Sequence, residues 1–218
     1  MTAGPDQRLS RRRLLQISAA ASVPALLAAC GEGGDARTAA TDDTAAAPEP
    51  SANRLEPTPA CDDGDDPTPE QTEGPFFTPD SPRRASLLEA GVAGTVLILS
   101  GRVLDTACEP VPGALLDFWQ ANADGEYDNE GFALRGHQFA DSRGRYRLET
   151  IVPARYTGRT RHIHVKAQPE GGATLTTQLY FPGEPGNAAD ALFDPRLVID
   201  ERAAGPRRRA LFDFVLDT

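Results

Sequence analysis

The chain is dominated by short runs of β-branched and aromatic residues that glycine or proline closes, and none of them sustains a helical period. Runs of this length and spacing are typical of strands in an antiparallel sandwich or barrel. One short segment, Ala85–Ala90, could form a helical turn. The sequence therefore predicts an all-β fold, an antiparallel β-sandwich with long loops and little helix, with strands at Thr95–Val103, Ala114–Gln120, Gly144–Ile151, His162–Ala167, Thr174–Phe181 and Ala210–Leu216.

Charge is distributed unevenly along the 218 residues, which carry a formal net charge of -10. Residues 31–66 hold ten acidic residues and two arginines, a net charge of -8 for this stretch alone. Its composition cannot bury enough apolar surface to offset the entropy of ordering, so we expect a disordered acidic tether. Residues 67–218 then form one domain. The acidic balance argues against nonspecific nucleic-acid binding, which needs clustered Lys and Arg.

The first 30 residues have the pattern of a targeting segment. Arg11, Arg12 and Arg13 precede an uncharged apolar run over 14–29, which is too short to cross a bilayer comfortably as a permanent helix. The opening resembles a bacterial twin-arginine export signal, and Leu27-Ala28-Ala29-Cys30 resembles a lipoprotein processing site. This resemblance implies lipidation of Cys30 and an exported protein, at the outer face of the cytoplasmic membrane or secreted. The alternative is a short amphipathic arm in which Cys30 has no special role.

Two further cysteines, Cys61 and Cys108, remain once Cys30 is set aside. In an exported protein two thiols pair more often than they stay free, so we expect a disulfide that joins the end of the tether to the sandwich. Two unpaired thiols are the alternative. No CxxC pair is present, which excludes a zinc ribbon or a thioredoxin-type motif.

Two of the three histidines lie in the run Arg161-His162-Ile163-His164-Val165. On a strand alternate side chains share a face, so both imidazoles point one way while Ile163 and Val165 point into apolar packing. Two imidazoles on one face suit a single metal ion. By itself the His-x-His pattern is weak, since it also arises by chance or in local hydrogen bonding.

Several short motifs occur in a fixed order along residues 68–181, and together they are more specific than any one of them. They are Thr68–Phe77, Trp119–Tyr127, Arg135–Gln138, Gly144–Tyr146 with Thr150–Pro153, Arg159–His164 and Gln178–Phe181. In their order and rough spacing the domain resembles the intradiol ring-cleavage dioxygenases, non-haem iron(III) enzymes that open catechols between the two hydroxyls. The resemblance implies a β-sandwich of that family's type, Fe(3+) as cofactor, a small catechol-type substrate and O2 as partners, and a cis,cis-muconate-type diacid as product.

Carried over by position, the resemblance assigns the iron ligands Tyr127, Tyr156, His162 and His164. Phenolate is a hard anionic donor that stabilises iron in the +3 state, and imidazole suits iron generally. Tyr156 is the ligand expected to leave the metal and act as a base toward a catechol proton. Arg159 is expected to stabilise negative charge on the attacked ring, and Gln178 to face the substrate with its amide.

Two other functions use the same residues differently. A zinc-dependent hydrolase or hydratase could be built on His162, His164 and His137, since three imidazoles and a water make a catalytic zinc site. A non-enzymatic exported binding module would use the sandwich only to present loops.

The loop between Tyr156 and His162 is shorter than in well-known intradiol enzymes, so we expect a more open centre. The sequence leaves the identity of the catechol and the oligomeric state open.

Overall fold

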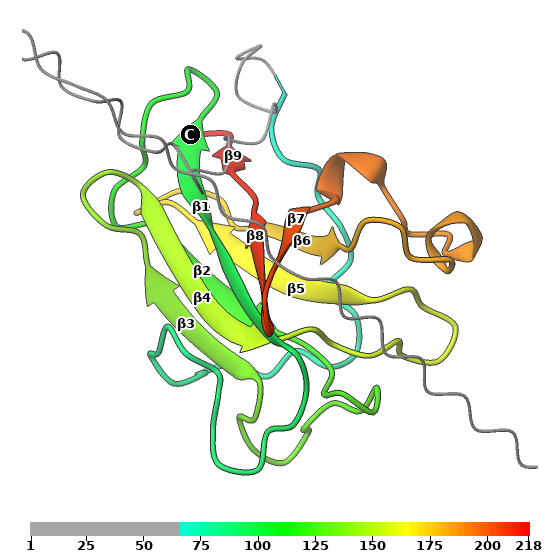
Figure 1. Ribbon diagram of the computed structural model, residues 1–218. Helices are drawn as coiled ribbons and strands as arrows, with labels where there is room; N and C mark the ends of the chain where they lie inside the picture. Colours follow the sequence, from blue (N-terminus) through cyan, green and yellow to red (C-terminus); the bar gives the residue numbers. More distant parts are fainter. Residues whose placement is uncertain (1–65) are drawn as a thin grey trace, which may run out of the picture. The chain divides into compact units, whose positions relative to one another are not determined.

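A computed structural model describes residues 66–218, which form nine strands and two single-turn 3-10 helices (Figure 1). The strands are β1 Val96–Asp105, β2 Leu115–Trp119, β3 Arg135–Phe139, β4 Arg145–Ile151, β5 His162–Gln168, β6 Leu175–Tyr180, β7 Asp200–Ala204, β8 Arg207–Leu211 and β9 Phe214–Leu216. The short helices η2 and η3 lie between β6 and β7, at Asn187–Ala189 and Pro195–Leu197.

The strands form two sheets. One has the order β4-β1-β8-β7, with β9 pairing with the end of β1, and the other has the order β3-β2-β5-β6. Every pair in the four-stranded sheet is antiparallel, as expected. The five-stranded sheet is mixed, because β1 runs parallel to both β8 and β9. Strand β8 also pairs with β7, in the antiparallel sense.

Alternation along the strands builds one core between the two sheets. Leu97 and Leu99 of β1 and Ile163 and Val165 of β5 are fully buried and belong to a single apolar cluster. Each such side chain stabilises the fold by roughly 1.5–3 kcal/mol relative to an exposed one. The residues between them point away from the core, and the two outer faces of the sandwich therefore carry the polar chemistry.

The all-β prediction is confirmed, and five expected strands match β1, β2, β4, β5 and β6 within two residues at each end. The sixth, Ala210–Leu216, divides at Phe212-Asp213 into the end of β8 and all of β9. Strands β3 and β7 were not expected from the sequence. Their segments, Arg-Gly-His-Gln-Phe and Asp-Glu-Arg-Ala-Ala, contain glycine or several charges, which are depleted in strands.

The helical turn expected at Ala85–Ala90 is wrong, because this segment is extended against the edge of β4. Ser86 forms a parallel bridge with Glu149, and the Leu87 amide donates to the Glu149 carbonyl at 2.7 Å. Leu87 is also fully buried in the core. A helical stretch this short is marginal in water, so the pairing with β4 decides its conformation.

Several sequence predictions concern residues outside the described range. These are the targeting segment with Cys30, the tether apart from Asp66, and Cys61. Cys108 is disulfide-bonded, and its pairing with Cys61 stays a prediction. Within residues 66–218, no helix has the length and apolar character needed to cross a bilayer.

Candidate metal centre

Strand β5 presents both of its histidines on one face, as its alternation predicts. Ile163 and Val165 enter the core, while His162 and His164 point to the outer face of the four-stranded sheet. Both imidazoles are nevertheless only 3–4% exposed. The segment 71–77 covers this face: the Thr72 carbonyl accepts from Gln178, and the Phe77 ring packs edge-on against Trp119, both partners lying directly opposite His164 in register.

Three of the four predicted ligand atoms converge on one point. His162 Nε2 lies 3.1 Å from His164 Nε2 and 3.3 Å from the phenol oxygen of Tyr127. The Tyr156 ring stands edge-on to the Tyr127 ring, with 5.9 Å between their centroids. The fold therefore brings together residues from β5 and from two separate loops.

Hydrogen bonding and burial leave the two imidazoles in the form that ligates a metal. His162 Nδ1 lies 2.7 Å from the carbonyl oxygen of Thr160, which can only accept, so Nδ1 carries the proton and Nε2 presents a lone pair. Burial lowers the pKa of His162 to about 4 and that of His164 well below its ordinary value. Both rings are therefore neutral near pH 7. His164 Nδ1 is buried without a hydrogen-bond partner among the described residues.

The two tyrosines sit in an aromatic pocket. Phe76 stacks on Tyr127, with ring centroids 4.4 Å apart, and meets Tyr156 edge-on. Desolvation raises the pKa of the Tyr127 phenol, and the charges of Arg159 and Arg135 oppose this only in part. Such a phenol stays protonated at neutral pH unless a cation stabilises the phenolate. The phenol oxygens of Tyr127 and Tyr156 and two neutral imidazoles form a donor set that fits Fe(3+).

Arg159 is fixed by a buried ion pair. Its Nε donates to both carboxylate oxygens of Asp190, at 2.9 and 3.1 Å, and its Nη2 donates to Gln178 Oε1 at 2.6 Å. Desolvation would raise the pKa of Asp190, but the amides of Leu192 and Thr160 and the Arg159 side chain outweigh it and lower the pKa. Asp190 is therefore ionised and holds the guanidinium in one orientation.

Gln178 is fully buried on β6, directly opposite His164. Its Nε2 donates to the Thr72 carbonyl at 2.8 Å, while its Oε1 accepts from Arg159. Both ends of the amide are engaged, so Gln178 supports the position of Arg159 and ties the covering segment to the sheet. A contact of its amide with the substrate stays a prediction.

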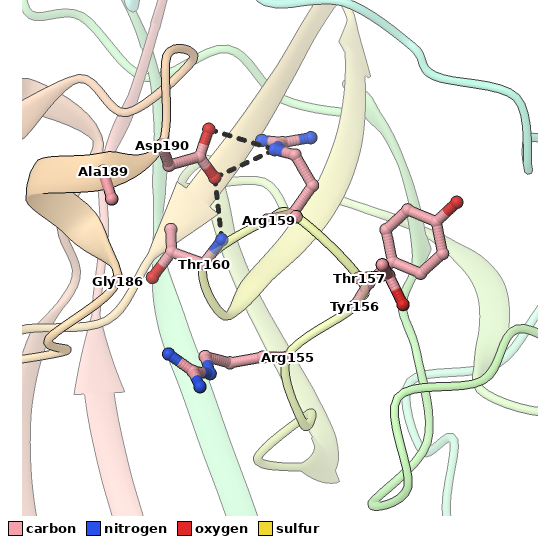
Figure 2. A pocket seen from close by; sticks show the side chains of 9 residues that line it. Arg155, Tyr156, Thr157, Arg159, Thr160, Gly186, Ala189 and Asp190 are labelled. Atoms are coloured by element: carbon pink, nitrogen blue, oxygen red, sulfur yellow. Dashed lines mark hydrogen bonds and ion pairs between the residues drawn. The ribbon is translucent and has the colours of Figure 1, made fainter.

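A cavity of about 400 Å³ opens beside Tyr156 and Arg159 (Figure 2). The loop Arg155–Thr160 forms one wall and residues of the segment 186–190 form another. In Figure 2 Arg159 reaches toward Asp190, and the Tyr156 ring projects away from Arg155 on the other side of the loop. The volume lies in the range of small-molecule pockets and accommodates a single aromatic ring. The short loop noted in the sequence thus borders a space of substrate size.

Two residues of the centre were missed by sequence reasoning. Trp119 on β2 stacks on the His164 ring, with 4.8 Å between centroids and 8° between planes. Its position directly opposite His164 follows from strand register, which the sequence does not reveal. Asp190 lies just after η2, in a stretch of small and polar residues with no signal that sets it apart.

The three-histidine zinc site is not formed. His137 lies on β3 opposite Asp117, and its Nδ1 is 2.7 Å from the Ser81 carbonyl oxygen. Across residues 66–218, which contain all three histidines, no group of three or more His, Cys, Asp or Glu could hold a metal ion. The zinc hydrolase alternative is therefore wrong, because the fold directs His137 into a separate hydrogen-bond network.

Comparisons with known proteins agree with this geometry. A family model described as Dioxygenase matches residues 72–218. The dioxygenase domain of a dioxygenase carbohydrate-binding protein fusion from Streptomyces sp. SirexAA-E is 60% identical, with a TM-score of 0.69 over 70% of this chain and 99% of that one. The structure of 3-chlorocatechol 1,2-dioxygenase from Rhodococcus opacus 1CP is 28% identical, with a TM-score of 0.64 over 72% of this chain and 75% of that one.

Curated relatives are more distant and longer. The protocatechuate 3,4-dioxygenase beta chain of Burkholderia cepacia is 34% identical over 57% of this chain and 58% of its own length. The match to catechol 1,2-dioxygenase of Acinetobacter baylyi covers 62% of that protein. This chain thus spans less than two thirds of these two relatives. The family model covers most of the chain, and the chain belongs to the intradiol ring-cleavage dioxygenases, a family that uses non-haem Fe(3+).

Proposed function

We propose that this chain cleaves the aromatic ring of a catechol-type substrate between its two hydroxyls, using O2 and a bound ferric ion, to give a cis,cis-muconate-type diacid. The observation that carries the proposal is the convergence of three ligand atoms beside Tyr156: His162 Nε2 lies 3.1 Å from His164 Nε2 and 3.3 Å from the Tyr127 phenol oxygen. The donor set fits Fe(3+), and Tyr156, one of the four predicted ligands, lines a cavity large enough for one ring.

Each residue has a task that follows from its surroundings. Ferric iron, when bound, holds the diol and makes the ring susceptible to O2. His162 and His164 supply neutral donors, and Tyr127 supplies a buried phenolate that the metal charge stabilises. Tyr156 borders the cavity, where its phenolate oxygen can take a proton from a substrate hydroxyl. Arg159, held by Asp190, places fixed positive charge at the cavity wall, where negative charge develops on the ring.

Oxygen uptake by the iron-loaded protein tests this function. We expect one O2 consumed per catechol, a diacid product that carries both atoms of ¹⁸O2, and a visible absorption band from phenolate-to-iron charge transfer that shifts when a catechol is added without oxygen. A panel of catechol, protocatechuate, hydroxyquinol and larger diols identifies the preferred substrate. A colourless protein that binds zinc in place of iron, or that consumes no O2 with any member of the panel, would contradict the proposal.

The alternative of a non-enzymatic binding module makes a different prediction. Such a module would bind aromatic ligands or none, without a metal-dependent spectrum and without oxygen consumption. No observation on residues 66–218 favours it, whereas the clustered donors and the fixed Arg159 give the enzymatic proposal its support.

We further propose that the protein is exported and lipid-anchored through Cys30, at the outer face of the cytoplasmic membrane. The support is the sequence alone: adjacent arginines, an apolar run and Leu27-Ala28-Ala29-Cys30. Fractionation of cells that express the chain with Cys30→Ser tests it. We expect the variant in a soluble exported fraction. If the variant stays in the membrane fraction to the same extent as the parent, the lipid anchor is contradicted.

A further inference from the structure

The outer face of the five-stranded sheet gathers arginines from four strands. Directly opposite residues share a face, and the register pairs Arg102 with Arg145, Ser100 with Arg147, and Arg209 with Arg202. Leu97 and Leu99 point into the core, so Ile98 and its partner Arg209 point outward. We call this surface the arginine face; its members are Arg102, Arg145, Arg147, Arg202, Arg207 and Arg209, all exposed.

This concentration contrasts with the charge of the domain. Residues 67–218 contain 21 acidic and 16 basic residues, a net charge of -5, yet six of the 16 cations lie on one sheet face. Acidic side chains pair with some of them, as in Arg147 with Glu149 and Arg202 with Asp200. Arg207 and Arg209 have no ion-pair partner among the described residues. The face therefore presents excess positive charge on an otherwise acidic domain.

The arginine face and the candidate metal centre lie on opposite sides of the sandwich. His162 and His164 point outward from the four-stranded sheet, because Ile163 and Val165 fill the core. The arginines point outward from the other sheet, across that same core. A partner that covers the arginine face therefore leaves the centre uncovered.

We propose that the arginine face docks on an anionic phospholipid surface. Guanidinium groups bind phosphate oxygens through paired hydrogen bonds, and arginines near an anionic bilayer attract it additively. The face is built on paired strands, so its cations are presented as a broad array that suits an extended surface. A single lipid attachment and a polybasic patch together hold a protein more firmly than either alone. Docked in this way, the domain would turn its metal centre away from the membrane toward the medium.

Vesicle binding tests the proposal on the full chain carrying Cys30→Ser, so that no lipid attachment contributes. The double variant Arg207→Gln/Arg209→Gln is compared with Arg83→Gln/Arg196→Gln, which removes the same charge from outside the arginine face. We expect the first pair to weaken binding to vesicles of phosphatidylcholine and phosphatidylglycerol by about tenfold or more, and the control pair by much less. Binding should also fall as salt is added.

Other outcomes would overturn the proposal. Equal loss in the two double variants would show that net charge, not the arginine face, governs binding. Equal binding to pure phosphatidylcholine vesicles, which carry the same phosphate groups but no net charge, would show that the negative charge of the surface is not what the arginine face recognises. If the face variants lose binding to a soluble anionic polysaccharide, while the parent does not bind anionic vesicles, the partner is a polysaccharide. Far-UV circular dichroism of both variants shows whether the sandwich is intact.

Discussion

Strand alternation points side chains outward from both sheets of the sandwich, but one outer face is buried and the other is exposed to water. On the four-stranded sheet, the outward residues His162, His164 and Gln178 are buried, because the segment 71–77 crosses over them. On the five-stranded sheet, outward residues such as Arg145 and Arg147 stay exposed. The covered face holds polar groups out of water at fixed distances, whereas the open face leaves its cations exposed to water.

This difference changes what the same interaction contributes. In the Arg159–Asp190 pair the side chain of Asp190 is 2% exposed, and two backbone amides also donate to its carboxylate. The Arg147–Glu149 pair on the open face has half-exposed partners and screening by water and salt. A buried pair is costly to break, and an exposed pair contributes about 0–1 kcal/mol. The covered face is therefore suited to holding catalytic side chains in fixed positions, and the open face to attracting anionic partners through its exposed cations.

The largest effect is expected from removing a ligand on the covered face. His164→Ala should abolish iron binding and reduce ring cleavage by more than about 100-fold, beyond the loss typical of residues that only orient a ligand. Tyr127→Phe should do the same, because it removes the phenolate oxygen. The measurements are iron content per chain, the visible spectrum and oxygen uptake. The matched control is His137→Gln, which changes the third histidine and should keep both iron and activity.

These variants should keep the sandwich, since neither side chain belongs to the apolar cluster between the sheets. Circular dichroism and the unfolding temperature check this point. Parental turnover in either His164→Ala or Tyr127→Phe would show that the ligand assignment is wrong.

The next largest effect is expected from substituting a glycine near Tyr156, where two glycines can be compared. Gly125 has φ +85°, and a Cβ there would lie 2.5 Å from the Arg155 carbonyl oxygen, next to the loop that carries Tyr156. Gly158 has φ +78° in the same loop, but a Cβ would meet nothing within 4 Å. Gly125→Ala should therefore cost about 3 kcal/mol of unfolding free energy and displace Tyr156, while Gly158→Ala should cost only the backbone strain of about 1–2 kcal/mol.

Urea denaturation and the visible spectrum of the iron-loaded protein separate the two variants. Since Tyr156 is a predicted ligand, Gly125→Ala should alter the charge-transfer band, and Gly158→Ala should leave it close to that of the parent. Similar losses in the two variants would mean that the close approach of Gly125 to Arg155 is unimportant.

The contrast between the faces also explains what could be predicted from the sequence. The period-2 pattern around His162 and His164 fixes β5 and the face of both histidines, so this part of the centre was predictable. The burial of that face was not, because it depends on the segment 71–77 folding across strands about 100 residues away. Asp190 was missed for the same reason. It binds Arg159 only because the folded chain brings these two residues, 31 positions apart in the sequence, into contact.

Strands with unfavourable composition were the other failure. Strand β3 contains Arg135, a residue that is 1% exposed and whose guanidinium donates to the Asp128 and Phe76 carbonyls. Its local sequence resembles a loop, and long-range hydrogen bonds make it a strand. Strand β7 forms because it pairs with β8 along the open face, where charged residues remain in water.

A moderate effect is expected from Asp190→Asn, which removes one charge from the buried pair. The loss should be about 2 kcal/mol of unfolding free energy, below the full range for a broken buried pair because Arg159 is partly exposed. Ring cleavage should fall about tenfold or more, since the guanidinium loses its fixed orientation. Arg196→Gln, in the exposed pair with Asp194, should cost less than about 1 kcal/mol and leave activity unchanged. Equal effects of the two substitutions on oxygen uptake would show that Asp190 does not position Arg159.

The smallest effect is expected in the pH dependence of stability. Two aspartates, one beside each sheet, should change the free energy of unfolding in opposite directions as pH rises. Desolvation raises the pKa of Asp117 on the four-stranded sheet, although the Ser81 hydroxyl and nearby cations oppose it. Hydrogen bonds from the Arg145 side chain and amide lower the pKa of Asp141, in the turn before β4, to about 2. The stability from Asp117 is therefore full below its unfolded pKa and lost as pH rises through its folded pKa. The stability from Asp141 is present above its unfolded pKa and lost as pH falls through about 2.

Asp117→Asn keeps an acceptor for Ser81 and removes the charge, so its stability relative to the parent should rise between acid and neutral pH. Asp141→Asn should show the opposite trend, losing stability relative to the parent as pH rises. Urea denaturation across this pH range measures both differences. Parallel pH profiles for the two variants would mean that burial on the covered face does not govern Asp117, and the contrast between the faces would then fail for single carboxylates.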